Sequence, residues 1–304
     1  MTTSRRSALG CLLLLLVALN LLAVYPVATQ DRPGTPLPDR EAFLREVKKK
    51  LRREDRDIYP YIYNEREVQV EFDGDGKATK RTVKTYEVYP LEGHEPYRRL
   101  ISTNGVPTDP RKLEDADRKH QQKVQEWVRD RKNESASDRA KREQKEARAR
   151  QEEARSIEEV FRVFDVRLVG REFVRGRPAI ATTFAPRPGV EPVDNDLDIL
   201  TKVRGRALVD EQEHELVRVD AETTDTITWG FGLLARLYKG STLSFERQKV
   251  NGEAWLPVRL FVHPRARLAL LRRYDTETTR DYSDYRKFTV DTATSFTLPK
   301  PPGR

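Results

Sequence analysis

The spacing of hydrophobic residues predicts a helix near the start of the chain. From Glu41 to Arg53 the hydrophobic side chains Phe43, Leu44, Val47 and Leu51 recur at helical spacing, which places them on one face of an amphipathic helix. The other face carries a basic stripe formed by Lys48–Lys50 and Arg52-Arg53. Cations near the C-terminal end of a helix are favourable by themselves, so this basic stripe predicts either a solvated face or a surface that docks on a membrane.

Further along, the hydrophobic spacing changes from helical to every second residue, which indicates strands. Hydrophobic and polar residues alternate over Val68–Phe72, and after the turn sequence Asp73–Gly76 a second alternating segment covers Thr82–Tyr89. This pattern predicts a β-hairpin. An EF-hand calcium loop that began at the turn would need a Gly and a Glu at fixed later positions, and neither is present. We therefore interpret this sequence as a turn only, and expect another strand at Tyr97–Ser102.

A long charged segment follows these strands. Asp109-Pro110 is a favourable helix start, with Asp as the N-cap and Pro in the first turn, and helix-forming residues continue to Val163. Asn133–Ser137 predicts a break, and Ser156–Glu159 matches a capping box, which predicts a new helix start. We expect a helical insertion at about 109–163. Its mixed charge is typical of a solvated helix, and the alternative is a partner-binding arm at Lys112–Arg155.

The C-terminal half predicts a β-meander from Asp165 to Asp291, with antiparallel neighbours because the intervening turns are short. The expected strands are Asp165–Gly170, Pro178–Phe184, Arg204–Asp210, Leu216–Thr224, Thr226–Tyr238, Thr242–Val250, Ala254–Val262, Arg267–Thr278 and Tyr285–Thr289. Together with the earlier strands they form a sheet of about ten to twelve, which must curl. The predicted fold class is mainly β (α+β): a large curled antiparallel sheet or half-open β-barrel, with covering helices and the charged helical insertion.

The first thirty residues predict export from the cytoplasm. Arg5 and Arg6 precede the apolar run Cys11–Val24, a pattern typical of a secretory signal peptide at 1–30. The run is shorter than the ~20 residues of a membrane-spanning helix, and an uncleaved N-terminal anchor is the alternative. Residues 31–40 form a Pro-rich linker, 41–291 a single domain and 292–304 a flexible tail. We expect a periplasmic protein whose contact with membranes is peripheral at most.

Composition and charge narrow the classes of partner. The chain has 304 residues, 57 Lys and Arg against 49 Asp and Glu, and one Cys. A single Cys excludes a disulfide framework and Cys-rich metal sites. Outside the cytoplasm, the anions that a net charge of +8 would meet are phospholipid head groups, other envelope polymers or acidic proteins. The sequence has no zinc-finger, helix-turn-helix or RNA-recognition motif, so we expect no nucleic-acid partner.

Candidate catalytic and metal motifs are missing from the sequence. The four histidines, His94, His120, His214 and His263, are isolated from one another, and no H-E-x-x-H, G-x-S-x-G or glycine-rich phosphate loop occurs. We therefore predict no metal and no cofactor, and expect the protein not to be an enzyme. Catalysis would require a constellation that forms only in the folded chain.

The C-terminal strands are dense in large hydrophobic residues. These could simply form the core, but a curled sheet has one concave face, and unfilled apolar volume there can hold a ligand. The candidate lipid cavity is lined by Trp229, Phe231, Leu233, Leu234, Leu237, Phe245, Trp255 and Leu256. Four arginines could meet an anionic head group at its rim: Arg265, Arg267, Arg272 and Arg273.

Several of these segments resemble a known family. Gly205–Asp210 followed by Leu216–Val219 is similar to the strand–turn–strand of bacterial outer-membrane lipoprotein-sorting proteins, although Ala207 and Leu208 replace the commonest residues. Trp229–Leu237, Trp255–Pro257 and Tyr282–Phe288 resemble further signatures of one group among them. The resemblance covers about residues 61–288 and points to the LolA/LolB/LppX/RseB-like superfamily.

The resemblance implies a half-open antiparallel barrel around helices, with an apolar cavity for acyl chains. None of the superfamily's ligand-contacting residues can be matched to positions here, and the long helical insertion departs from its compact carriers. The leading hypothesis is an envelope protein that binds the acyl chain of a lipid or lipoprotein. The alternative is a protein-interaction or envelope-sensor module that uses the charged arm at residues 112–155 to bind an envelope protein.

Overall fold

The computed structural model describes residues 36–52, 61–91, 94–229, 235–268 and 272–287. The expected signal peptide at 1–30, the first half of the linker and the tail at 292–304 lie outside the described residues and stay predictions. No helix in the described part of the chain combines the length and the hydrophobicity needed to cross a membrane.

The described chain consists of four helices and fourteen strands. The helices are α2 (Arg40–Leu51), α3 (Pro110–Lys132), α4 (Ala136–Val163) and the 3-10 helix η2 (Asn195–Lys202). The strands are β1 (Tyr61–Phe72), β2 (Ala78–Leu91), β3 (His94–Thr103), β4 (Val106–Pro107), β5 (Phe164–Val174), β6 (Arg177–Pro186), β7 (Val203–Asp210), β8 (Leu216–Thr223), β9 (Ile227–Trp229), β10 (Ala235–Leu237), β11 (Thr242–Val250), β12 (Ala254–His263), β13 (Arg265–Leu268) and β14 (Arg272–Lys287).

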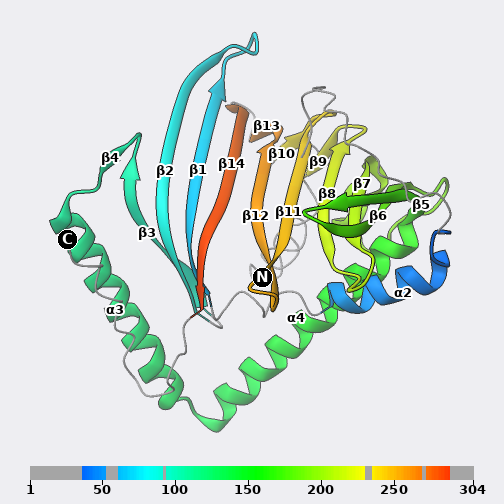
Figure 1. Cartoon of the computed structure of the whole chain (residues 1–304). Helices are drawn as coiled ribbons and strands as arrows, with labels where there is room; N and C mark the ends of the chain where they lie inside the picture. Colours follow the sequence, from blue (N-terminus) through cyan, green and yellow to red (C-terminus); the bar gives the residue numbers. More distant parts are fainter. Residues whose placement is uncertain (1–35, 53–60, 92–93, 230–234, 269–271, 288–304) are drawn as a thin grey trace.

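These strands form one open antiparallel sheet (Figure 1). Its order is β4-β3-β2-β1-β14-β12-β11-β8-β7-β6-β5, and β9, β10 and β13 extend it beside β14. The last strand, β14, pairs with the first, β1, and with β12, so the two halves of the chain share a single sheet. Because β4 and β5 lie at opposite edges, the sheet does not close. The predicted fold class, a large curled antiparallel sheet with helices, is confirmed.

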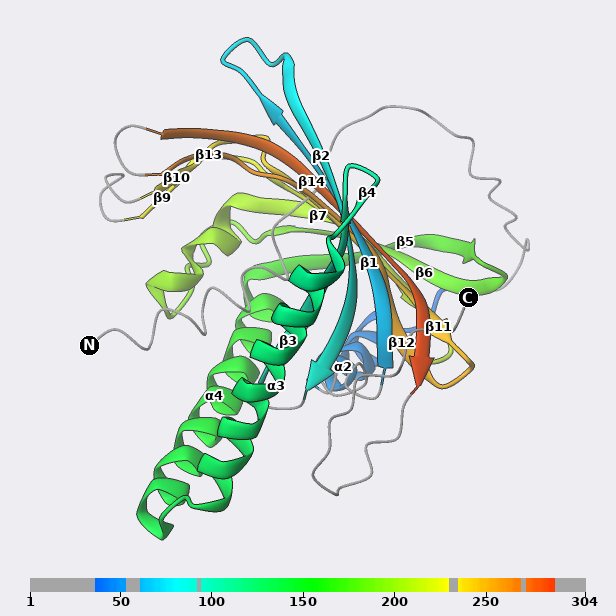
Figure 2. The ribbon, with the colours of Figure 1, turned by 90° about the vertical axis from the view of Figure 1, so that its left-hand side faces the viewer.

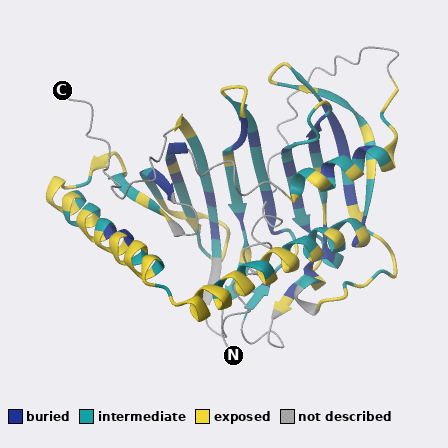
Figure 3. Ribbon diagram, turned by 90° about the horizontal axis from the view of Figure 1, so that it is seen from below, coloured by how far each residue is buried: buried dark blue, intermediate teal, exposed yellow. Residues whose placement is uncertain are grey.

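The sheet is bent, and the helices lie on its concave side (Figure 2). On that side α2 packs against β6 and β7, where Phe43 and Val47 contact Ile180 and Val209 in one buried cluster. Helices α3 and α4 form a V that extends away from the sheet (Figure 1), and most of their surface is exposed (Figure 3). The sheet and α2 therefore form the body of the protein, and much of the helical insertion is solvated.

The helix ends follow the capping signals of the sequence, with one exception. The Asp39 side chain accepts a hydrogen bond from the Ala42 amide at 2.8 Å, and Asp109 caps α3 as expected. Helix α3 ends at Lys132, and α4 begins after Ser135, so the expected break is confirmed. The helix start expected at Ser156 is wrong: α4 continues to Val163, and the Ser156 hydroxyl donates to the Glu152 carbonyl at 3.0 Å, as a serine does inside a helix.

The strand predictions differ from the structure mainly near the C-terminus. The two strands expected at Arg267–Thr278 and Tyr285–Thr289 belong largely to one strand, β14, which runs through to Lys287. A local irregularity at Asp284, whose φ is +54°, shifts the pairing with β1 without ending the strand. The strand expected at Thr226–Tyr238 corresponds to β9 and β10, and residues 230–234 between them lie outside the described residues.

The register of the sheet determines which side chains share the concave face. Phe245 of β11 is paired with Val219 of β8 and with Leu260 of β12, and these three hydrophobic side chains lie on one face because paired residues point the same way. Towards β5 the same face continues with Ala207, which is paired with Thr182. The concave side of this half of the sheet is thus apolar where the helices cover it.

Candidate functional site

An apolar cavity of about 210 Å³ lies between the concave face and the covering helices. Its walls come from α2, the C-terminal turns of α4, η2 and strands β5, β6, β7, β8 and β11. The lining residues are Leu44, Val47, Leu51, Glu153, Ser156, Ile157, Val160, Phe161, Phe164, Val166, Thr182, Phe184, Leu197, Leu200, Ala207, Val209, Leu216, Val219 and Phe245. All are apolar except Glu153, Ser156 and Thr182, so the cavity suits hydrocarbon rather than a charged ligand.

Both hydroxyl groups of the lining have hydrogen-bond partners. The Thr182 hydroxyl donates to the Ala207 carbonyl at 3.2 Å, and the Ser156 hydroxyl is bound within α4. Glu153 is half-exposed on α4 and is the one titratable side chain in the lining. Polar groups that are already satisfied attract a polar ligand weakly, so the specificity of the cavity is for shape and hydrophobicity.

Helix spacing places the hydrophobic residues of α2 and α4 in the cavity. In α2, Leu44, Val47 and Leu51 lie three and four residues apart, and in α4 Ile157, Val160 and Phe161 follow the same rule. Leu44, Leu51, Ile157 and Phe161 are only half-buried. The boundary between α2 and α4 is therefore where the apolar lining reaches the solvent, and we call it the mouth of the cavity.

A shared carboxylate holds α2 against α4 beside the mouth. The Glu158 side chain of α4 accepts hydrogen bonds from both Lys48 and Arg52 of α2, and the Lys48 ammonium also lies 5.7 Å from the centre of the Phe161 ring. The hydrogen bond from Lys48, together with the charge of Arg52, lowers the pKa of Glu158 below its ordinary value. Since all three groups are partly exposed, we expect this clamp to be weak and able to open.

The structure places the eight predicted cavity residues in different surroundings. Phe245 lines the cavity, and Leu237 belongs to the same buried cluster without reaching the lining. Phe231, Leu233 and Leu234, together with the side chain of Trp229, lie outside the described residues. Trp255 and Leu256 pack elsewhere.

Trp255 contacts Ala181 and Val217 in a separate cluster. Their chain neighbours Thr182 and Leu216 line the cavity, and successive side chains of a strand point to opposite faces. Trp255 therefore lies on the convex face. Leu256 packs with Tyr61 and Ala254 in a third cluster.

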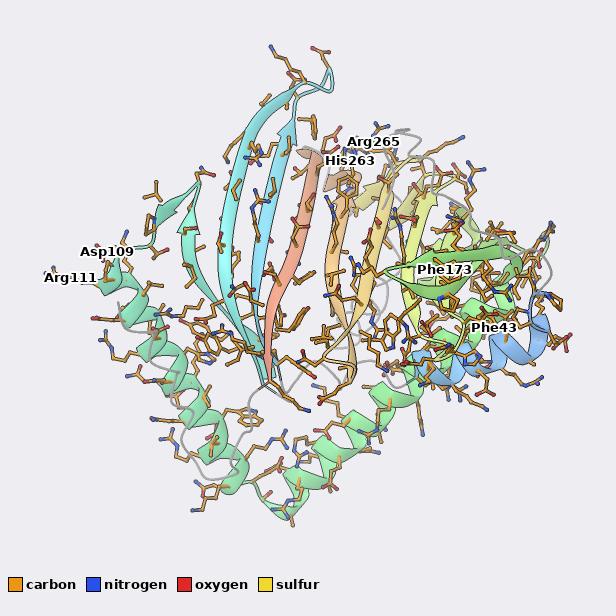
Figure 4. All side chains as sticks on the ribbon, in the orientation of Figure 1. Phe43, Asp109, Arg111, Phe173, His263 and Arg265 are labelled. Carbon is orange, nitrogen blue, oxygen red and sulfur yellow. The ribbon has the colours of Figure 1, made fainter. Side chains whose placement is uncertain are left out.

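The two predicted head-group arginines with described side chains, Arg265 and Arg267, do not line this cavity. Arg265 is exposed and Arg267 half-buried. Figure 4 shows Arg265 at the upper edge of the sheet and Phe43 of α2 at its lower right. The side chains of Arg272 and Arg273 lie outside the described residues. Beside the mouth, the described cations are Lys48 and Arg52, which contact Glu158.

The other half of the concave face carries a buried ion network that the sequence analysis did not find. Glu65 and Glu67 of β1 are each 4% exposed, beside Arg98 of β3 and Arg280 of β14. The Arg98 guanidinium contacts both carboxylates, with a distance of 3.1 Å to Glu67, and Arg280 lies 2.8 Å from Glu67 and 3.6 Å from Glu65. Two carboxylates and two guanidinium groups cancel in charge, so this network offers no net charge to a ligand, and each buried carboxylate has a cationic partner.

Tyrosine rings surround this network. Burial raises the pKa of Tyr63 to about 12, and Arg98 stacks over Tyr86 with 4.0 Å between the guanidinium carbon and the ring centre. The sequence signal was the charged residues at alternate positions of β1. Their partners come from β3 and β14, and only the register of the sheet reveals them. Within the described part of the chain, no cluster of His, Cys, Asp and Glu side chains has the composition of a metal site.

Comparison with known proteins finds matches among solved structures only. No protein-family model matches the sequence, and no curated protein sequence matches it. Among solved structures, a domain assigned to outer membrane lipoprotein-sorting proteins from Vibrio parahaemolyticus aligns over 84% of this chain and 93% of its own, with 10% identity and a TM-score of 0.33. A LolA superfamily protein from Nitrosomonas europaea covers 84% of this chain and 96% of its own, with 9% identity and a TM-score of 0.27.

A DUF1329 family protein from Desulfovibrio piger covers 84% of this chain and 94% of its own, with 14% identity and a TM-score of 0.27.

Proposed function

We propose that this protein is a non-enzymatic envelope protein that binds an acyl chain, as a free lipid or on a lipoprotein, in the cavity beneath α2 and α4. The observation that carries the proposal is the cavity itself: a pocket of about 210 Å³ whose lining is apolar apart from Glu153, Ser156 and Thr182. Removing hydrocarbon from water is favourable by ~0.8 kcal/mol per methylene group. An acyl chain therefore gains affinity from every carbon that it places there.

The lining also supports binding rather than catalysis. Acid–base chemistry needs a titratable group next to the reacting atoms, and Glu153 is the one such group in the lining. A volume of about 210 Å³ is below the ~300–1,000 Å³ of pockets that enclose a drug-sized ligand. Part of an acyl chain fits as the structure stands, and a longer one requires α2 to move away from α4, which a weak clamp at Glu158 permits.

Filling the cavity tests this proposal. Ala207 is a half-buried lining residue on β7, so the substitution Ala207→Phe places a ring in the cavity. We expect uptake of a fluorescent fatty acid to fall at least tenfold, while the free energy of unfolding changes by less than ~1.5 kcal/mol because the ring enters existing space.

A matched control is Ala185→Phe on the neighbouring strand β6, where the side chain is exposed and outside the cavity lining. It should leave uptake unchanged. If Ala207→Phe takes up as much probe as Ala185→Phe and the wild type, the probe binds outside this cavity. Native mass spectrometry of the exported wild type then identifies any bound lipid by its mass and separates free lipid from a lipoprotein.

A further inference from the structure

The outer face of α2 carries four cations at helical spacing. Arg45, Lys48, Lys49 and Arg52 follow the i, i+3, i+4, i+7 pattern, which places them on one side of the helix. The opposite side holds the residues that line the cavity, so α2 is an amphipathic helix with a basic and an apolar face. We call these four residues the α2 basic stripe.

The stripe keeps a positive charge after its ion pairs are counted. Lys48 and Arg52 share the single carboxylate of Glu158, and Lys49 lies 2.6 Å from Glu46. Arg45 is exposed, and no carboxylate of the described residues lies within ion-pair distance of it. Within residues 45–52, the four stripe cations against two carboxylates leave two positive charges over about two turns. Glu41, one turn earlier on the same face, reduces the net charge to one over about three turns.

The stripe is also continuous with the mouth of the cavity. Lys48 lies four residues after Leu44 and three before Leu51, so it neighbours both on the helix surface. Both leucines line the cavity while remaining half-exposed. A helix with a basic face and adjoining apolar side chains is the kind that lies on an anionic lipid surface. The cations would meet the head groups, and the half-exposed leucines would face the acyl region.

We propose that the α2 basic stripe docks this protein on an anionic phospholipid surface and presents the mouth of the cavity to the membrane. With the protein docked in this way, an acyl chain would pass between the bilayer and the cavity along the apolar edge of α2, with little exposure to water. The docking step depends on charge at the helix surface and not on occupancy of the cavity, so it goes beyond the binding function proposed above.

The test uses the exported full chain and vesicles of phosphatidylcholine with or without phosphatidylglycerol. The variant Arg45→Gln/Lys49→Gln removes two cations of the stripe and spares Lys48 and Arg52, which hold α2 to Glu158. A matched control is Arg81→Gln/Lys80→Gln on β2. There Arg81 is likewise exposed, and Lys80 lies 2.9 Å from the exposed Glu71.

We expect the wild type to sediment with the anionic vesicles, less so at high salt, and not with the neutral ones. A cation near an anionic surface contributes a factor of about five to binding, so the stripe variant should bind roughly 25-fold more weakly. The control, which changes the net charge equally, should lose about twofold or less.

Equal losses in the two variants would mean that net charge alone is responsible, and would overturn the proposal. Failure of the wild type to bind anionic vesicles would also overturn the proposal, and would favour an acidic protein as the partner of the stripe. Uptake of a fluorescent fatty acid without vesicles is measured on the same samples and should match the wild type in both variants. Vesicle binding without uptake would refute the cavity function while leaving the docking surface intact.

Discussion

Two residues of one strand provide a direct test of whether the cavity is a binding site or a packing defect. Leu243 and Phe245 are both on β11 and both point to the concave face. Leu243 is completely buried in the main core cluster, whereas Phe245 is half-buried and lines the cavity. Truncating each to Ala changes the same strand, but only one of the two side chains borders open space.

The expected cost follows from the atoms around each side chain. Leu243→Ala removes a packed side chain and leaves a void, so it should cost about 4 kcal/mol, within the ~2–5 kcal/mol found for such truncations. A buried Phe→Ala change costs ~3–5 kcal/mol. Phe245 has packed neighbours on one side only and forfeits fewer dispersion contacts, so we expect about 2 kcal/mol.

Urea unfolding measures both values, and an unchanged m-value confirms that the comparison is valid. Uptake of a fluorescent fatty acid is measured in parallel. We expect Phe245→Ala to weaken uptake several-fold, because the acyl chain loses a contact, and Leu243→Ala to leave it within about twofold. If Phe245→Ala costs 4 kcal/mol or more and uptake does not change, the residue is ordinary core and the cavity is not the binding site.

Three more predictions concern the sheet, the clamp and the N-terminus. A Cβ at Gly205 would overlap the Asp220 carbonyl oxygen and the Phe184 ring, so Gly205→Ala should cost at least ~2 kcal/mol in urea unfolding, whereas Gly170→Ala, with open space around it, should stay within ~0.5 kcal/mol. The lowered pKa of Glu158 means that its contribution is present above the unfolded value of ~4.3 and is lost as the pH falls through the folded value. The protection factors of the α2 amides, which are corrected for the intrinsic pH dependence of exchange, should therefore fall in acid in the wild type, but show no such step in Glu158→Gln. Intact mass of the exported chain should give an N-terminus between Ala23 and Asp31, and a mature chain beginning at an acylated cysteine would contradict the signal-peptide prediction.

Local patterns predicted the elements of this fold better than they predicted the site. Alternation of hydrophobic and polar residues predicted most strands, helical spacing predicted α2, and the N-cap Asp109 predicted the start of α3, because each of these signals depends on residues close in sequence. The capping-box pattern at Ser156 failed since α4 was already under way, and a helix in progress satisfies the amides that a cap would serve. The long strand β14 was divided because its polar alternation resembles a turn region around Ser283 and Asp284.

The site depended on contacts that no local pattern contains. Phe245 was found because it is a large hydrophobic residue in an alternating strand, but Trp255 satisfies the same rule and lies on the convex face. Which face a residue occupies is set by register, and β11 and β12 have a register shift between Glu246 and Arg247 that local alternation does not reveal. The contributions of α2 and η2 to the lining were missed for a related reason: helix positions relative to a sheet follow from packing and not from sequence spacing.

The two halves of the concave face explain why a ligand would occupy one end of the sheet. Strands β6, β7, β8 and β11 present Thr182, Ala207, Val219 and Phe245 to it, whereas β1 and β14 present Glu65, Glu67 and Arg280. An acyl chain lying across the second group would remove water from the partly exposed guanidinium groups of Arg98 and Arg280 without replacing its hydrogen bonds, which is unfavourable. Across the first group it displaces only water from apolar surface, which is favourable. On the function proposed here, the ion network would therefore confine hydrocarbon to the end of the sheet covered by α2 and α4, beside the cations of the α2 basic stripe.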